Sequence, residues 1–163
     1  MVFVTVGSAP QGFRRLLQAV DELAASGAFG ATPVFMQIGN VEGFIPAHCE
    51  YKKFVSRDEF RQLLERASLV ISHGGATPLE IIRVGKVPIV MPRRRKYGEI
   101  VNDHQVEFVQ VLARQGRIIP AMEPDELPAA VLKAKECNVH PMPLEPSPMI
   151  ALVSDGMKEL LEQ

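Results

Sequence analysis

Short apolar runs alternate with longer amphipathic segments along most of the chain. The runs are rich in β-branched residues and predict strands over residues 2–6, 33–39, 50–55, 69–72, 87–92 and 117–120. Between them, apolar residues recur every three or four positions, which predicts helices over residues 13–26, 57–67, 78–85, 101–116 and 123–136. Strands that alternate with helices form βαβ units, so the pattern predicts an α/β domain with a mostly parallel sheet covered on both faces.

The same pattern divides the chain into three parts. Residues 1–137 have the length of one domain with a full-sized core. Residues 138–148 contain four prolines and are typical of an extended linker. Residues 149–163 predict a last helix with an apolar face, which would either fold back on its own domain or dock on a partner.

Composition narrows the class of protein. The chain is 47% hydrophobic and 23% charged with a net charge of −1, which is typical of a soluble globular domain and gives no field that would hold nucleic acid. Cys49 and Cys137 are far apart, so a disulfide framework is disfavoured and a cytoplasmic location is expected. No signal peptide and no apolar stretch of membrane-spanning length is recognisable.

Unusual residues follow the predicted strands, at the edge of a parallel sheet where ligands bind. They are Gly7 and Ser8, Gly39, Phe54 and Val55, His73 to Thr77, and Arg93 to Lys96. In "SHGGATPLE", Gly74 and Gly75 would allow a sharp turn and close approach of a ligand to the backbone. Thr77 is then expected as the helix N-cap and Pro78 as the first helical residue, at a helix end that suits a phosphate.

A simpler interpretation of this segment stays open, in which Thr77 and Glu80 form only a capping box and His73 is a polar residue in a tight turn. Other nucleotide and catalytic motifs are missing. "GSAPQGFR" has the outer glycines of a P-loop but no lysine, and neither GxGxxG, GxSxG nor HExxH occurs. The four histidines share no metal-ligand spacing, so we predict no metal and no other cofactor.

A second polar cluster occupies residues 92–108, "PRRRKYGEIVNDHQVEF". Sugar hydroxyls are bound by short groups that donate and accept hydrogen bonds, and Asn102, Asp103, His104 and Gln105 are of this kind. The cations from Arg93 to Lys96 would suit a uronate carboxylate, a diphosphate or anionic lipid head groups. Alternatively, the cations form a solvated loop and "NDHQ" is the polar first turn of a helix.

Residues 71–108 resemble the nucleotide-sugar-binding half of GT-B glycosyltransferases of family 28. "VFVTVGS", "FMQIGN" and "YKKFVSRDEFRQLLERASLVISHGG" fit the same pattern in order, so the likeness extends to about Ala121. It is similar to the short PssE-type subunits of bacterial exopolysaccharide and capsule synthesis, to the catalytic subunit of the dolichol-linked N-acetylglucosaminyltransferase and, more distantly, to MurG. The resemblance implies a Rossmann-like three-layer domain, the donor half of a GT-B enzyme.

The resemblance also implies a role for each matching position. The turn of His73, Gly74, Gly75, Ala76 and Thr77 would hold the UDP diphosphate, assisted by Arg93, and Glu80 would bind the ribose. Phe54 and Val55 would contact uracil, while Asn102, Asp103, His104 and Gln105 would contact the transferred sugar. Gly7 and Ser8 would face the acceptor, and His73 is a weak candidate for a catalytic group.

In the resembled families the second half of the enzyme is a separate membrane-associated, PssD-like subunit that binds a lipid-linked saccharide acceptor. An inverting transfer needs a base close to the acceptor hydroxyl, and this base would come from that partner. The chain would therefore bind the donor, without a metal, at the inner face of the membrane. Glucuronate, galactose, glucose and N-acetylglucosamine stay open as donor sugars, the first two being those that the PssE-type relatives suggest.

Two other classes of function stay open on the sequence. The chain could be a non-catalytic Rossmann-like module that binds a nucleotide or regulates a partner. It could also be a small nucleotide-processing enzyme that acts without a partner. "NDHQ" together with Glu80 favours the donor subunit over both.

Overall fold

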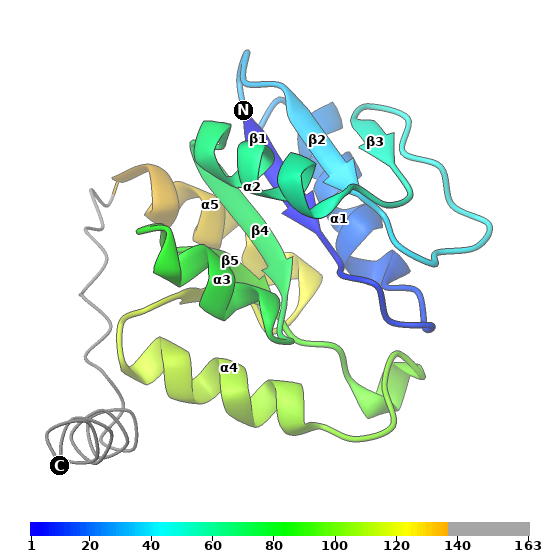
Figure 1. Ribbon diagram of the computed structural model, residues 1–163, viewed down its shortest axis with the longest axis vertical. Coiled ribbons are helices and arrows are strands. Elements are labelled where there is room, and N and C mark those ends of the chain that lie inside the picture. The colour runs from blue at the N-terminus through cyan, green and yellow to red at the C-terminus, as the bar shows by residue number, and fades with distance from the viewer. Residues whose placement is uncertain (137–163) are drawn as a thin grey trace, which may run out of the picture.

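The computed structural model describes residues 1–136 of the chain, which form an α/β domain around one sheet (Figure 1). All six strands are parallel, in the order β3-β2-β1-β4-β5-β6. Their bounds are Val2–Thr5 for β1, Val34–Gln37 for β2, Glu50–Lys52 for β3, Leu69–His73 for β4, Ile89–Met91 for β5 and Ile119–Pro120 for β6. The prediction of a Rossmann-like α/β domain is confirmed.

Residues 1–136 contain five α-helices. They are α1 (Arg14–Ala25), α2 (Arg57–Arg66), α3 (Thr77–Arg83), α4 (His104–Arg114) and α5 (Leu127–Glu136). Of these, α1 to α4 lie between strands and α5 follows β6. Two 3₁₀ turns, η1 (Arg95–Tyr97) and η2 (Pro124–Glu126), lie in the connections around α4 and α5. The side chain of Ser56 accepts a hydrogen bond from the Glu59 amide and caps α2.

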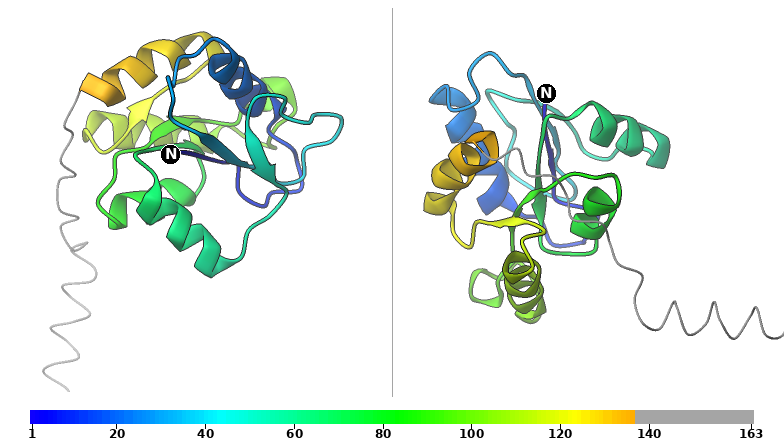
Figure 2. Two further views of the ribbon diagram at one scale, coloured as in Figure 1. Left: turned by 90° about the horizontal axis from the view of Figure 1, so that it is seen from above. Right: turned by 90° about the vertical axis from the view of Figure 1, so that its left-hand side faces the viewer.

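The helices form the two outer layers of the domain (Figure 2). Helices α1 and α5 cover one face of the sheet, and α2, α3 and α4 cover the other. Successive side chains of a strand point to opposite faces of the sheet, so both faces have an apolar core. Val2 and Val4 point into the core under α1, whereas Phe3 points into the core under α2.

The direction in which successive strands are added to the sheet reverses between β1 and β4. From β1 the strand order runs outward to β3 in one direction and to β6 in the other. The loops that follow β1 and β4 therefore lead to helices on opposite faces of the sheet, and ligands of such sheets bind at the carboxyl edge where these loops part. The connections 6–13, 38–49 and 92–103 gather at this side of the sheet (Figure 1).

Every strand and helix predicted within residues 1–136 is present, and the differences are at the ends. The predicted helix over residues 101–116 begins at His104, because residues 101–103 form a bend. No helix within residues 1–136 is long and apolar enough to cross a membrane. The predicted linker at residues 138–148 and the last helix at residues 149–163 lie outside the described residues, as does Cys137.

Candidate functional site

The imidazole of His73 lies between the loops that follow β1 and β4. The side chain is 7% exposed, and its ring packs between the backbones of Gly7 and Gly75. A Cβ on Gly7 would lie 2.7 Å from Cε1 of this ring, and a Cβ on Gly75 would lie 2.5 Å from Nε2. The loops that follow β1 and β4 are thus spaced by one aromatic ring.

This packing corrects the reason given above for the two glycines after β4. Neither Gly74 nor Gly75 has a positive φ, so the turn does not require glycine for its backbone conformation. Gly75 is needed because of the His73 ring, and Gly74 because a Cβ there would lie 2.8 Å from Cγ2 of Val109 on α4. Close internal packing explains the missing side chains at both positions.

The environment of His73 determines its charge. Burial, followed by the positive charge of Arg93, lowers the pKa of the imidazole to about 4. The ring is therefore neutral at physiological pH, and its Nδ1 is buried without a hydrogen-bond partner among the described residues. This position favours a spacing role for His73 over the catalytic role considered from the sequence.

The start of α3 differs from the predicted capping box. The N-cap is Ala76, Thr77 is the first helical residue, and no side chain caps this end of the helix. The prediction of Thr77 as N-cap was wrong by one residue, because Ala76 already has helical backbone angles. Glu80 is exposed and its side chain makes no hydrogen bond within the described part of the chain, so its carboxylate faces solvent one turn from the Gly74–Gly75 segment.

Arg93 is a buried residue rather than a solvent-facing cation. Its Nη2 donates to the carbonyl oxygens of Val6 at 2.9 Å and Gln11 at 3.4 Å, and its guanidinium lies 5.1 Å from the ring centroid of Phe13. Burial lowers the pKa of this guanidinium, and the charge of Glu99 opposes the shift. The side chain fixes the loop that follows β1, which leaves it poorly placed to assist a diphosphate directly.

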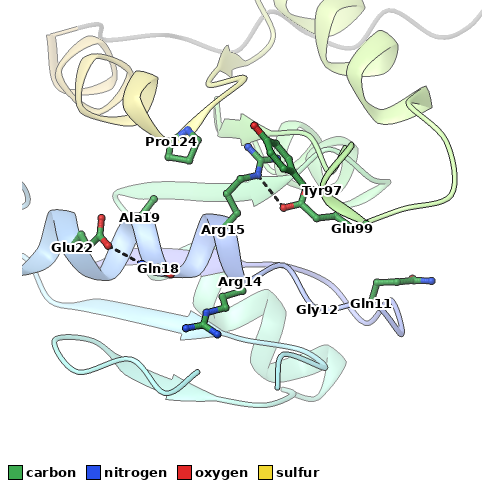
Figure 3. Close-up of a pocket in the computed structure, with 11 residues that line it drawn as sticks. Gln11, Gly12, Arg14, Arg15, Gln18, Ala19, Glu22, Tyr97, Glu99 and Pro124 are labelled. Atoms are coloured by element: carbon green, nitrogen blue, oxygen red, sulfur yellow. Dashed lines mark hydrogen bonds and ion pairs between the residues drawn. The ribbon is translucent and has the colours of Figure 1, made fainter. Parts of the chain in front are cut away.

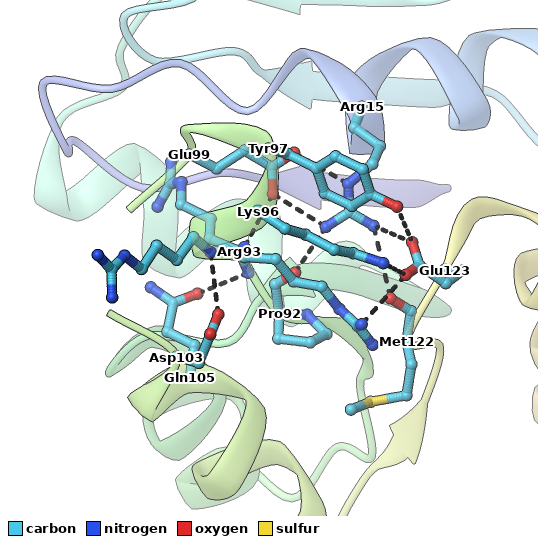
Figure 4. Close-up of polar contacts among 12 residues, drawn as sticks. Arg15, Pro92, Arg93, Lys96, Tyr97, Glu99, Asp103, Gln105, Met122 and Glu123 are labelled. Atoms are coloured by element: carbon cyan, nitrogen blue, oxygen red, sulfur yellow. Dashed lines mark hydrogen bonds and ion pairs between the residues drawn. The ribbon is translucent and has the colours of Figure 1, made fainter. Parts of the chain in front are cut away.

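The neighbouring cations are mostly neutralised inside the protein (Figure 4). Arg94 and Lys96 both pair with the Glu123 carboxylate, at 3.2 and 2.8 Å. Arg15, from α1, donates to both oxygens of the buried Glu99, each at 2.9 Å. Within the run, Arg94 and Lys96 pair with a carboxylate and Arg93 binds backbone carbonyls, so Arg95 is the cation whose side chain has no polar partner in the described structure.

The "NDHQ" cluster lies at the start of α4, and three of its side chains bind nearby backbone. Oδ1 of Asp103 accepts from the Arg95 amide at 2.9 Å, and Oε1 of Gln105 accepts from the Arg93 amide at 3.0 Å. Oδ1 of Asn102 accepts from the His104 amide at 3.3 Å. These bonds orient the cluster, since they use one oxygen of each side chain and leave the second polar atom of each available to a ligand.

The predicted uracil and acceptor positions lie at the neighbouring strand ends. Phe54, two residues past β3, is 46% exposed, whereas Val55 is partly buried against the core under α2. Ser8 is exposed in the loop after β1. That loop is fixed by Asn40, whose side-chain amide donates to the carbonyl oxygens of Ser8 at 3.4 Å and Ala9 at 3.0 Å.

Two supporting residues were missed from the sequence. Gln37 is buried at the end of β2 and hydrogen-bonds to the backbone of both Gly7 and Lys53. Asp21 is buried in α1 and accepts from the amides of Ala47 at 3.0 Å and His48 at 2.9 Å. The sequence could have indicated both, because each is a polar residue at a position where the apolar pattern predicts a buried side chain.

Asp21 also influences the protonation of Cys49, the one cysteine of the described region. Burial alone would raise the pKa of the Asp21 carboxyl, but the bonds from the Ala47 and His48 amides outweigh it and lower this pKa. Burial, together with the hydrogen bond to the Asp21 carboxylate, raises the pKa of the Cys49 thiol to about 12. Cys49 is therefore a protonated thiol and no nucleophile at neutral pH.

A hollow of about 690 Å³ lies beside this edge, between α1 and the segment that contains η1 (Figure 3). Its lining includes Arg14, Gln18, Tyr97 and Pro124. None of the residues predicted as ligands lines it, because it opens on the α1 face rather than toward the loop before α3. Within residues 1–136 no group of three His, Cys, Asp or Glu side chains is arranged to hold a metal ion.

Known proteins share this fold. The glycosyltransferase of kitacinnamycin superposes with a TM-score of 0.59 at 20% identity, over 99% of this chain and 39% of that one. The calicheamicin glycosyltransferase CalG4 superposes with a TM-score of 0.53 at 17% identity, over 81% of this chain and 34% of that one. The domain thus has the fold of the C-terminal half of GT-B glycosyltransferases.

Sequence comparison is more specific. The human protein named UDP-N-acetylglucosamine transferase subunit ALG13 is 31% identical over 125 residues, which are 72% of this chain and 10% of the human protein. This chain therefore spans about a tenth of the length of that relative. The profile of the glycosyltransferase family 28 C-terminal domain matches residues 1–158, and the chain belongs to this family.

Proposed function

We propose that this chain is the donor-binding subunit of a two-component glycosyltransferase that uses a UDP-sugar. The observation that carries the proposal is its membership of family 28, together with similarity to a protein named as a subunit of a UDP-N-acetylglucosamine transferase. The geometry is compatible with it, because Gly7, Phe54, Glu80 and Asp103 all follow strands at one edge of the sheet.

In this proposal the UDP diphosphate lies against the Gly74–Thr77 segment and the exposed Glu80 carboxylate accepts hydrogen bonds from the ribose hydroxyls. Uracil lies near Phe54, and the free polar atoms of Asp103 and Gln105 contact the donor sugar. Backbone amides stabilise the leaving diphosphate in place of a metal ion. His73 acts as the neutral spacer behind this segment.

The acceptor would be a lipid-linked saccharide held by a membrane-associated partner, in a pathway of bacterial exopolysaccharide or capsule synthesis. Two groups of the described domain are unsuited to act as the base, since His73 is buried and the Cys49 thiol is protonated. A base supplied by the partner agrees with this, and transfer by the isolated chain should be weak or absent. The chain would work in the cytoplasm, recruited to the membrane by that partner.

The experiment is a calorimetric titration of the chain with UDP, with ADP as the control ligand. We expect saturable binding of UDP that ADP does not share, and about tenfold weaker binding of UDP to Glu80→Ala because a charge-assisted bond is lost. Glu65→Ala is the matched control, since this glutamate is also exposed and lies on α2 away from the residues assigned to the ligand. Equal binding of UDP and ADP would contradict the proposal, and UDP binding that no attached sugar changes would favour a non-catalytic nucleotide-binding module.

A further inference from the structure

We propose that Gln37 is a positioning residue of the donor site, and this inference rests on the function proposed above. Its side-chain amide joins the loop after β1, which would face the acceptor, to the end of β3, which leads to the uracil position. The geometry therefore points to one buried group that sets the relative position of two parts of the binding edge.

The hydrogen bonds of Gln37 use the full capacity of its amide. Oε1 accepts from the hydroxyl of Thr5 at 2.6 Å and from the amide of Gly7 at 3.2 Å. Nε2 donates to the carbonyl oxygens of Gly7 at 2.9 Å and Lys53 at 3.3 Å. A buried amide with two bonds accepted and two donated has a single orientation, so it fixes the groups that it contacts.

Gly7 is held at both its amide and its carbonyl by this one side chain. The same peptide is enclosed from two other directions. A Cβ on Gly39 would lie 2.8 Å from the Gly7 carbonyl oxygen, and the His73 ring occupies the space where a Gly7 side chain would be. A displacement of the Gly7 peptide is therefore transmitted to His73 and onward to Gly75, against which the same ring packs.

On its other side Gln37 reaches the residue before Phe54. The Lys53 carbonyl accepts from Nε2 of Gln37 and from the backbone amide of Gly39 at 2.8 Å. Strand β3 is short and exposed along its length, so few other contacts hold this end. Loss of the Gln37 amide should consequently loosen the approach to Phe54 and the loop of Gly7 together.

The test uses the full chain with Gln37→Leu and Gln37→Glu, the second of which keeps the acceptor oxygen and loses both donors. Hydrogen exchange at the Gly7 and Gly39 amides reports the coupling, and both should exchange at least tenfold faster in the two variants. Val34→Ala is the matched control, because it removes core volume at the opposite end of β2 and touches none of these bonds. Faster exchange at Gly7 alone would overturn the coupling.

UDP titration then tests the positioning role. We expect UDP to bind at least tenfold more weakly to the Gln37 variants and with unchanged affinity to Val34→Ala, even where Val34→Ala lowers the melting temperature as much. Equal weakening in Val34→Ala, or none in the Gln37 variants, would overturn the inference. If the Gln37 variants do not fold, Thr5→Val should weaken UDP binding about threefold and Thr5→Ser should restore it, and no difference between these two would overturn it.

A wild-type chain that does not bind UDP would count against the proposed function instead, and the exchange measurement would still decide whether Gln37 couples the two loops.

Discussion

The imidazole of His73 occupies the space that a side chain on Gly75 would need, since a Cβ there would lie 2.5 Å from Nε2. The same ring also packs on Gly7, where a Cβ would lie 2.7 Å from Cε1. Two loops that come from different strands are thus held apart by a neutral aromatic ring. This relationship makes the HGG segment a packing unit as well as a candidate ligand site.

Gly75→Ala should destabilise the fold by about 1–3 kcal/mol through this overlap. In a His73→Ala background the same substitution should cost much less, because the ring that it meets is gone. The measurement is a double-mutant cycle from urea unfolding curves. Additive effects of the two substitutions would mean that the ring and the glycine are not in contact.

The burial of His73 predicts a pH dependence of stability. The pKa of the imidazole is about 4 in the folded chain, against 6.5 for the unperturbed group. Between these values the unfolded chain binds the proton and the folded chain does not, so the contribution is fully present above pH 6.5 and is lost as the pH falls toward 4. The difference corresponds to about 3 kcal/mol.

Unfolding of wild type and His73→Asn in urea, measured from pH 7 to pH 4, checks this expectation. Carboxylates titrate in the same range in both proteins, so the informative quantity is the difference between the two stability curves. His104→Asn serves as the control, because His104 is exposed at the start of α4. Parallel curves for wild type and His73→Asn would show that the ring is not held neutral by the fold.

The pair of Arg15 and Glu99 should matter far more than a surface ion pair. Glu99→Gln weakens a bidentate contact whose side chains are 14% and 8% exposed, and we expect a loss of about 2–4 kcal/mol. Lys52→Ala breaks an exposed pair with Glu59 and should cost less than about 1 kcal/mol. Thermal unfolding of the two variants side by side tests the contrast, which similar losses would refute.

Much of the fold was predictable because it follows local patterns. Buried strands appear as continuous apolar runs, and helices such as α1 appear as a 3.6-residue period, so the order of elements and the parallel sheet follow from the sequence. Helix ends were less predictable. Thr77 is a favourable N-cap residue by type, yet Ala76 takes that position because its backbone angles are already helical.

The groups that support the site could not be predicted, because their partners are remote in the chain. Gln37 contacts Gly7 across 30 residues, and Arg15 contacts Glu99 across 84. No local spacing reports such a contact. The polar clusters themselves were visible, but the sequence could not tell that Arg93 is buried on the Val6 carbonyl while the Glu80 carboxylate faces solvent.

The two polar atoms of Gln105 have different roles in this proposal: one holds the protein backbone and the other contacts the donor sugar. Its Oε1 accepts the Arg93 amide, whereas the proposed function assigns its Nε2 to the donor sugar. Gln105→Glu keeps an oxygen that can accept from the Arg93 backbone amide, so it should leave stability and UDP affinity nearly unchanged. Gln105→Met should lower stability by about 1 kcal/mol, because the Arg93 backbone amide loses its acceptor. In Gln105→Glu, the affinity that an attached sugar adds to UDP should change.

A panel of UDP-glucose, UDP-galactose, UDP-glucuronate and UDP-N-acetylglucosamine, each compared with UDP by calorimetry, measures this increment for wild type and Gln105→Glu. The carboxylate replaces a donor with an acceptor, so the increment should fall most for the sugar that the wild type binds best, and most steeply if that sugar is the anionic glucuronate. Increments that stay the same for all four sugars would restrict Gln105 to holding the Arg93 backbone, and sugar selection would then have to come from other groups at this edge.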